Sequence, residues 1–354
     1  MRFLGFLALV VAPFLARDLD DWLATRRLPA ALARPWAGFA GVVLVVLLVA
    51  VPSWSVTAAN FGVALDLTEA PVAACDAIAR DGVRGRAFNQ FELGGYLLWR
   101  FWPERDRLPF LDVHVAGTPE DRLATMQAFA DPAAWRALDA RHRFDWVLLR
   151  HRELPGAVLL DALDRDSTWA LISLDDVAAL YVRSSSPAAA HAYRVVPAGH
   201  QGIARLGDRC VADLALRGAA RAELERMARE SRASAGAHSY LSLLAELDGR
   251  AADAAREQRA ALAVDPFLPG GWERLGDLAL RAGDPRAALD AWRQAGRDHG
   301  PGLARRRGIA RAALGDRGAA IAELRRALRE DPGDLEAADS LSALESREGG
   351  ASPR

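Results

Sequence analysis

Lysine is absent from this sequence, and all 45 of its basic residues are arginines. Without lysine, a Walker-type phosphate-binding loop and Schiff-base chemistry on a lysine are excluded. Cysteine is scarce: Cys75 and Cys210 are the only two, too few for a tetrahedral zinc site. They lie in different predicted domains, so we do not expect a disulfide between them. No metal and no other cofactor is predicted.

The sequence also lacks an excess of charge of one sign. Its 45 basic and 46 acidic residues give a formal net charge of −1. Nucleic-acid-binding domains carry a basic surface, so a nucleic acid is not an expected partner. The sequence contains no HExxH, GxSxG, P-loop or dinucleotide-binding motif. We therefore assign no catalytic residue and do not expect an enzyme.

A long apolar run lies near the N-terminus. Residues 36–54 carry no charge and have Trp36 and Trp54 at their ends, a pattern typical of a helix that spans a bilayer. The shorter run over residues 3–16 is a second span, the remnant of one, or the apolar core of a signal peptide. We predict a membrane anchor over residues 1–54 and contact with the membrane through residues 36–54.

The loop between these two runs is rich in arginine. Arg17, Arg26, Arg27 and Arg34 lie close to the predicted membrane ends. Because cytoplasmic loops carry an excess of positive residues, this loop is expected in the cytoplasm. Everything after Trp54 then lies across the membrane. The predicted location is a bacterial inner membrane, with the C-terminal domains in the periplasm.

Residues 60–184 alternate short apolar runs with helical patterns, which predicts a small α/β domain with a partly parallel sheet. A closing hairpin is expected across Asp175 and Asp176, which favour a turn. The predicted strands are Arg86–Asn89, Leu108–Val115, Phe144–Leu149, Trp169–Ser173 and Val177–Val182.

The run NQFELGGYLLW, from Asn89 to Trp99, resembles the N-x-x-x-x-G-G-Y-L-x-W motif of a group of bacterial membrane proteins. That group is similar to the polytopic, GT-C-type glycosyltransferases that use lipid-linked sugars. The resemblance implies a soluble tail domain that follows the last membrane helix, with the catalytic carboxylates on earlier loops. Those loops have no counterpart in this sequence. The resemblance therefore implies a non-catalytic tail that works with a separate polytopic membrane subunit.

Three residues of this domain are candidate ligand-binding residues. Asp112 and His114 end a predicted strand and share one of its faces, where they could polarise a substrate hydroxyl or hold a metal. Asn89, before Gly94 and Gly95, could position a sugar or an anion at a helix start. The alternative is structural: Asp112 caps the loop, Asn89 caps the helix, and the glycines allow helix and sheet to meet. We predict no metal site.

From His238 onward the sequence repeats with a period of about 34 residues, the length of a tetratricopeptide repeat. Small residues recur where two helices cross, as at Gly276 and Gly308, and Pro266 and Pro332 follow the second helices. Single helix pairs cannot bury their apolar faces alone, so they must stack into an all-α solenoid. The predicted boundaries are a linker over 185–200, helical repeats over 201–346 and a disordered tail over 347–354.

In such arrays the concave face comes mainly from the first helix of each pair. The register places there Ser239, Glu246, Glu273, Asp277, Arg281 and Arg305. Their mixed charge predicts a polar peptide or protein surface as partner, and the alternative is a spacer or a self-association surface. The chaperone-tail clamp of this family depends on Lys and Asn at these places, and both are missing.

These patterns together predict a membrane-anchored, non-catalytic scaffold that binds other proteins in the cell envelope. The alternative is the tail of a split or truncated glycosyltransferase-like protein that acts in glycan assembly.

Overall fold

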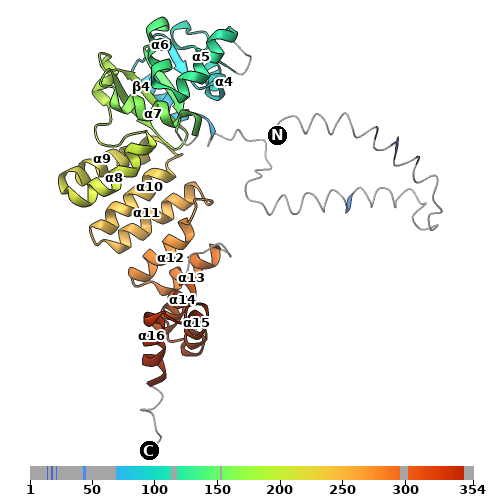
Figure 1. Ribbon diagram of the computed structural model, residues 1–354, viewed down its shortest axis with the longest axis vertical. Coiled ribbons are helices and arrows are strands. Elements are labelled where there is room, and N and C mark those ends of the chain that lie inside the picture. The colour runs from blue at the N-terminus through green and yellow to red at the C-terminus, as the bar shows by residue number, and fades with distance from the viewer. Residues whose placement is uncertain are drawn as a thin grey trace, which may run out of the picture. The chain divides into compact units, whose positions relative to one another are not determined.

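The computed structural model describes residues 69–112, 118–151, 154–295 and 302–346, together with a few isolated positions before residue 45. The chain divides into two compact units, Met1–Leu65 and Asp66–Arg354. The second unit contains a small sheet with its covering helices, followed by a series of helix pairs (Figure 1).

The membrane-spanning helices are the part of the fold prediction that is wrong. Among the described residues, no helix is both long and apolar enough to cross a bilayer. Apolar composition predicts a span only where about 20 such residues also form one helix. The runs 3–16 and 36–54 lie almost entirely outside the described residues, as does the predicted tail over 347–354. The periplasmic location stays an untested prediction.

The sheet has four strands in the order β1-β2-β4-β3. Strand β1 runs parallel to β2, whereas β4 pairs antiparallel with both β2 and β3, so the predicted mixture of parallel and hairpin pairing is confirmed. The Asp175 carboxylate closes the β3–β4 turn by accepting the N–H groups of Val177 and Ala178, both at 2.8 Å. The strands are β1 (Ala87–Asn89), β2 (Trp146–Arg150), β3 (Trp169–Leu174) and β4 (Ala178–Arg183).

Side chains alternate between the two faces of the sheet, as the pleat requires. On β2, Trp146 and Leu148 belong to one hydrophobic cluster, and Val147 and Leu149 belong to another. The first cluster is completed by α3 (Val72–Arg80) and α4 (Gly94–Phe101). The second is completed by α5 (Pro119–Ala130), α6 (Pro132–His142) and α7 (Leu154–Arg165). Helices therefore cover both faces.

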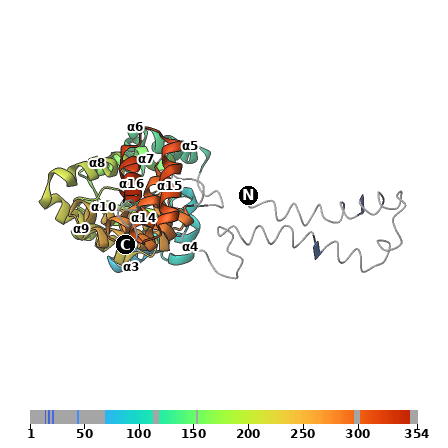
Figure 2. The same ribbon diagram turned by 90° about the horizontal axis from the view of Figure 1, so that it is seen from below.

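After the sheet the chain is helical. Helices pack in successive pairs, α8 with α9, α10 with α11, α12 with α13 and α14 with α15, and α16 packs on the last pair (Figures 1 and 2). The bounds are α8 (His200–Ala212), α9 (Leu214–Glu230), α10 (Ala235–Leu247), α11 (Ala251–Val264), α12 (Gly271–Arg281), α13 (Pro285–Gln294), α14 (Leu303–Ala313), α15 (Arg317–Glu330) and α16 (Leu335–Ser346).

Small residues stand where the two helices of a pair are in close contact. A Cβ added to Gly276 of α12 would overlap the indole of Trp292 on α13, and one added to Gly308 of α14 would come within 2.8 Å of the Leu324 side chain on α15. Ser242 takes the same place in α10, and its hydroxyl donates to the Ala254 carbonyl at 2.9 Å. The predicted need for small residues at the crossings is confirmed.

The segment predicted as a linker is packed in the structure. Residues 194–201, which include its end and the start of α8, donate six backbone N–H groups to three carboxylates. Glu223 of α9 accepts three of them, Asp164 of α7 accepts two and Asp161 of α7 accepts one. One hydrophobic cluster also runs from the sheet into α8, α9 and α10. The α/β part therefore covers the first end of the helix pairs and buries the apolar surface that a solenoid end would otherwise expose.

Candidate protein-binding face of the helix pairs

Charged side chains on the first helices of successive pairs form ion pairs with one another. We call the set the charge ladder. It links α10 to α12, α12 to α14, and α14 to the start of α16. Its members are Glu246, Glu273, Arg274, Asp277, Arg281, Arg305, Arg306, Asp334 and Glu336.

The first rung joins α10 to α12. The Glu246 carboxylate accepts from Arg274 Nη2 at 2.7 Å and lies 2.5 Å from Arg281 Nη1. Arg274 and Arg281 are about two helical turns apart, so they lie on the same side of α12 and both reach the end of α10. One carboxylate thus holds two guanidinium groups.

The second rung joins α12 to α14 through a single arginine. Arg306 donates to Glu273 Oε1 at 2.6 Å and to both carboxylate oxygens of Asp277, at 2.6 and 2.7 Å. The Trp292 indole N–H also donates to Asp277 Oδ1, at 3.2 Å. Asp277 is therefore held from α13 and from α14.

The third rung joins α14 to α16. Arg305 Nη1 donates to Asp334 at 3.0 Å, and its Nε lies 3.3 Å from Glu336. Asp334 also accepts the N–H of Ala337 at the start of α16. Desolvation raises the pKa of Asp334, but the hydrogen bonds from Ala337 and Arg305 outweigh it, and the pKa lies below its usual value.

Five of the six predicted groove residues belong to the ladder, all except Ser239. That residue lies on α10, half-buried, and its hydroxyl has no hydrogen-bond partner. The prediction missed four members: Arg274, Arg306, Asp334 and Glu336. Opposite charges about one repeat length apart, as in Asp277 with Arg306 or Arg305 with Asp334, are the sequence signal that would have found them.

The side-chain amide of the candidate residue Asn89 has a structural role. Its Oδ1 accepts the N–H groups of Phe110 and Leu111, at 2.8 and 3.4 Å, and its Nδ2 donates to the carbonyls of Leu111 and Gln90, at 2.7 and 3.0 Å. The amide is thereby saturated within the protein. A Cβ on Gly94 would strike the Leu111 carbonyl, so this glycine provides room for the same loop.

This contact corrects one expected strand. Residues 108–112 carry no strand, because the Asn89 side chain takes the backbone groups of Phe110 and Leu111 that would pair with a neighbouring strand. Asp112 is buried and interacts within the protein. His114 lies outside the described residues. The ligand-binding role of Asn89, Asp112 and His114 stays a prediction.

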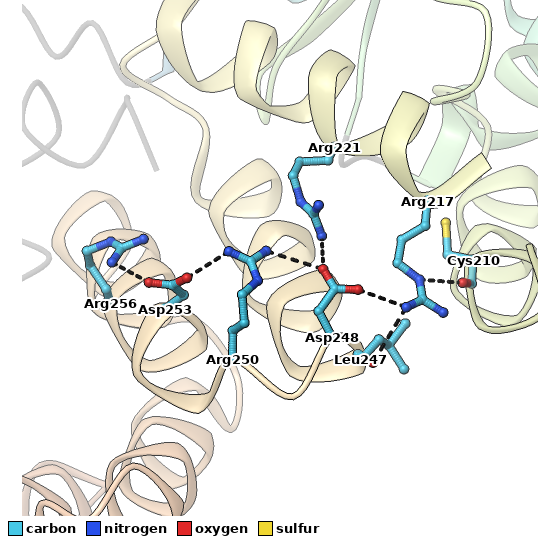
Figure 3. Close-up of polar contacts among 8 residues, drawn as sticks. All are labelled: Cys210, Arg217, Arg221, Leu247, Asp248, Arg250, Asp253 and Arg256. Atoms are coloured by element: carbon cyan, nitrogen blue, oxygen red, sulfur yellow. Dashed lines mark hydrogen bonds and ion pairs between the residues drawn. The ribbon is translucent and has the colours of Figure 1, made fainter. Parts of the chain in front are cut away.

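A second polar network lies at α9 and the ends of α8 and α10 (Figure 3). The Asp248 carboxylate receives hydrogen bonds from Arg217, Arg221 and Arg250. These bonds, that of Arg217 first, hold the pKa of Asp248 at about 2. Arg217 also donates to the carbonyls of Cys210 and Leu247. The network therefore connects three helices. Its central carboxylate, that of Asp248, is already hydrogen-bonded to three arginines.

No protein-family model and no curated protein matches this chain. A solved structure with partial similarity is the first TPR of Spaghetti (RPAP3) bound to an HSP90 peptide, SRMEEVD. It is 20% identical, covers 32% of this chain and 93% of that chain, and has a TM-score of 0.29. Similarity at that level supports no conclusion about a ligand of this chain. The packing of the helix pairs by itself fits a tetratricopeptide-type repeat region.

Proposed function

We propose that this chain is a protein-binding scaffold and that its charge ladder is the surface on which a partner binds. The observation that carries the proposal is the row of paired charges of both signs on successive first helices. Such a row suits a partner segment that itself carries both acidic and basic side chains. Each partner charge can replace one member of a ladder pair without leaving the other member unpaired.

At the outer members of the ladder this exchange costs little free energy. The side chains of Arg281 and Glu336 are 53% and 63% exposed. Ion pairs this accessible contribute at most about 1 kcal/mol, because water screens them and ordering two long side chains costs entropy. The pair of Arg306 with Asp277 is more enclosed and would keep the helices in place while a partner binds.

Among the described residues, no three His, Cys, Asp or Glu side chains cluster as a metal site would require. The absence of catalysis stays a prediction. A role as a glycosyltransferase tail has no supporting contact in the described part of the chain, and a role in the cell envelope rested on the membrane anchor.

Site-specific photo-crosslinking in cells tests the proposal. A photoreactive phenylalanine analogue would replace Arg281 or Glu336 on the ladder, and Arg259 or Arg329, which are exposed on second helices, as matched controls. We expect one shared adduct from the two ladder positions, weakened by Arg306→Glu, and none from the controls. Equal adducts from all four positions, or none, would support the spacer interpretation instead.

A further inference from the structure

The pair of α14 and α15 departs from the two pairs before it at two core positions. Just before Gly276 stands Leu275, and three residues after it stands Ala279; both are buried. Leu241 and Ala245 hold the same places around Ser242, and both are buried too. Around Gly308 the corresponding residues are Arg307 and Arg311. Two long cations thus occupy positions where the preceding repeats place Leu and Ala.

These two arginines line a cavity of about 310 Å³ between α13, α14 and α15. The other lining residues are Leu289 and Arg293 of α13 and Glu323 of α15. Arg293 is exposed, so the cavity has a wall in contact with solvent. Water takes up about 30 Å³ per molecule, so the space is large enough for a small hydrated anion.

The polar groups around the cavity are incompletely satisfied by the protein. Arg311 Nε and Glu323 Oε2 are buried atoms that find no hydrogen-bond partner among the described residues. Within the described part of the chain, the hydrogen bond of Arg307 is a long one, 3.3 Å to the Trp292 carbonyl. Buried donors and acceptors left without partners cost free energy, so their persistence calls for a ligand or water.

The charge of the lining favours an anion. Among the described lining residues, three arginines and one glutamate leave two net positive charges. Arg293 and Arg311 also pair with Asp290 and Asp316, at 2.9 and 3.1 Å, but these partners lie outside the lining. Both aspartates are more than half exposed, so the pairs are weak and can be exchanged.

We propose that this cavity binds a tetrahedral oxyanion of the phosphate class. The guanidinium fork matches the spacing of two phosphate oxygens, and phosphate carries close to two negative charges near neutral pH. The site lies between the helices and is separate from the charge ladder. The test of the anion site is therefore independent of the test of the proposed partner surface.

The test is thermal unfolding of the full chain in sodium phosphate against sodium chloride at equal ionic strength, with titration calorimetry to measure Kd and stoichiometry. At about five times Kd we expect phosphate to raise the midpoint by about 2 °C, with one site per chain. Sulfate, which has the same shape, should act in the same direction.

Two variants make the test specific. Arg307→Leu with Arg311→Ala restores the residues of the preceding repeats, and it should abolish the phosphate effect while leaving a folded chain. Arg329→Ala removes an exposed arginine of α15 and should keep the effect. An equal response to chloride, or a phosphate effect that survives in the double variant, would overturn the proposal.

A final arm distinguishes the source of the phosphate group. O-phosphoserine and inorganic phosphate would be titrated separately into the wild-type chain. Similar affinities would support a site for phosphate carried on a larger molecule. Binding of inorganic phosphate alone would support a site for the free anion.

Discussion

The indole of Trp292 on α13 lies across α12 at Gly276, where no side chain could fit between them. The same indole N–H reaches the Glu273 carbonyl and the Asp277 carboxylate. One residue therefore connects the packing of a helix pair to the charge ladder, so core substitutions here should also affect the ladder.

Gly276→Ala should lower the free energy of unfolding by about 1–3 kcal/mol, because the new methyl group must displace a fully buried indole. The measurement is urea denaturation followed by circular dichroism. Gly318→Ala is the matched control, since Gly318 lies in α15 with open space around it. That change should be neutral or stabilise the helix by up to about 1 kcal/mol. Equal effects at the two positions would contradict the packing argument.

The Arg306–Asp277 pair should couple more strongly than an ordinary surface pair. In a double-mutant cycle with Arg306→Gln and Asp277→Asn, we expect a coupling of about 1 kcal/mol, decreasing with added salt. Arg306 and Asp277 are largely enclosed, whereas Arg326 and Glu330 are half-exposed at a similar distance of 2.7 Å. The same cycle on that pair should give about 0.3–0.5 kcal/mol. If the two couplings agreed, the ladder would have no special stabilising role.

Asp248 should make stability depend on acid pH. Hydrogen bonds from Arg217 and its neighbours lower the pKa of Asp248 from 3.8 to about 2 in the folded chain. The folded state therefore binds fewer protons than the unfolded state in this range, and the contribution disappears as pH falls from about 4 to about 2. Asp248→Asn should cost about 1 kcal/mol at pH 7, a value limited by solvent screening.

The measurement is the wild-type minus Asp248→Asn difference in urea midpoints between pH 7 and pH 2.5. It should stay constant down to about pH 4 and then shrink, as the pKa of Asp248 requires. A difference that persisted unchanged at pH 2.5 would show that packing, and not ionisation, sets the effect.

Glu223 should hold the packed segment between the sheet and the helix pairs. Its carboxylate accepts three backbone N–H groups, from Arg194, Val195 and Val196. Glu223→Ala leaves these donors unpaired and should cost about 2–4 kcal/mol. Hydrogen exchange should then quicken at those three amides. Glu225→Ala, at an exposed position two residues later, should change neither quantity.

Asn89 should matter for folding whether or not a ligand binds. Asn89→Ala leaves the backbone groups of Phe110 and Leu111 without partners, and we expect a loss of about 2–4 kcal/mol in the free energy of unfolding. Glu92→Ala, an exposed position three residues later, should have little effect. A stable Asn89→Ala variant would show that the loop does not depend on this amide.

Local signals in the sequence were enough for most individual elements. The start of α6 shows such a signal, since Asp131 precedes Pro132 and accepts the Ala133 N–H at 2.8 Å. The hairpin across Asp175 and the small residues at Gly276 and Gly308 are confirmed. Each of these depends on neighbours close in sequence or on the period of one repeat, so the pattern contains the information needed.

Contacts between distant segments were decided only by the tertiary structure. No strand forms over residues 108–112, the described part of the strand expected over Leu108–Val115, because Asn89, about twenty residues earlier in the chain, pairs with the backbone groups of Phe110 and Leu111. The ion-pair partners of Glu246, Asp277 and Arg305 lie on the next repeat. The pattern within one repeat does not say which of these charged side chains meet. The sequence by itself determined most of the segments that become helices or strands, because that choice depends largely on local periodicity. Which side chains meet depends on how those segments pack.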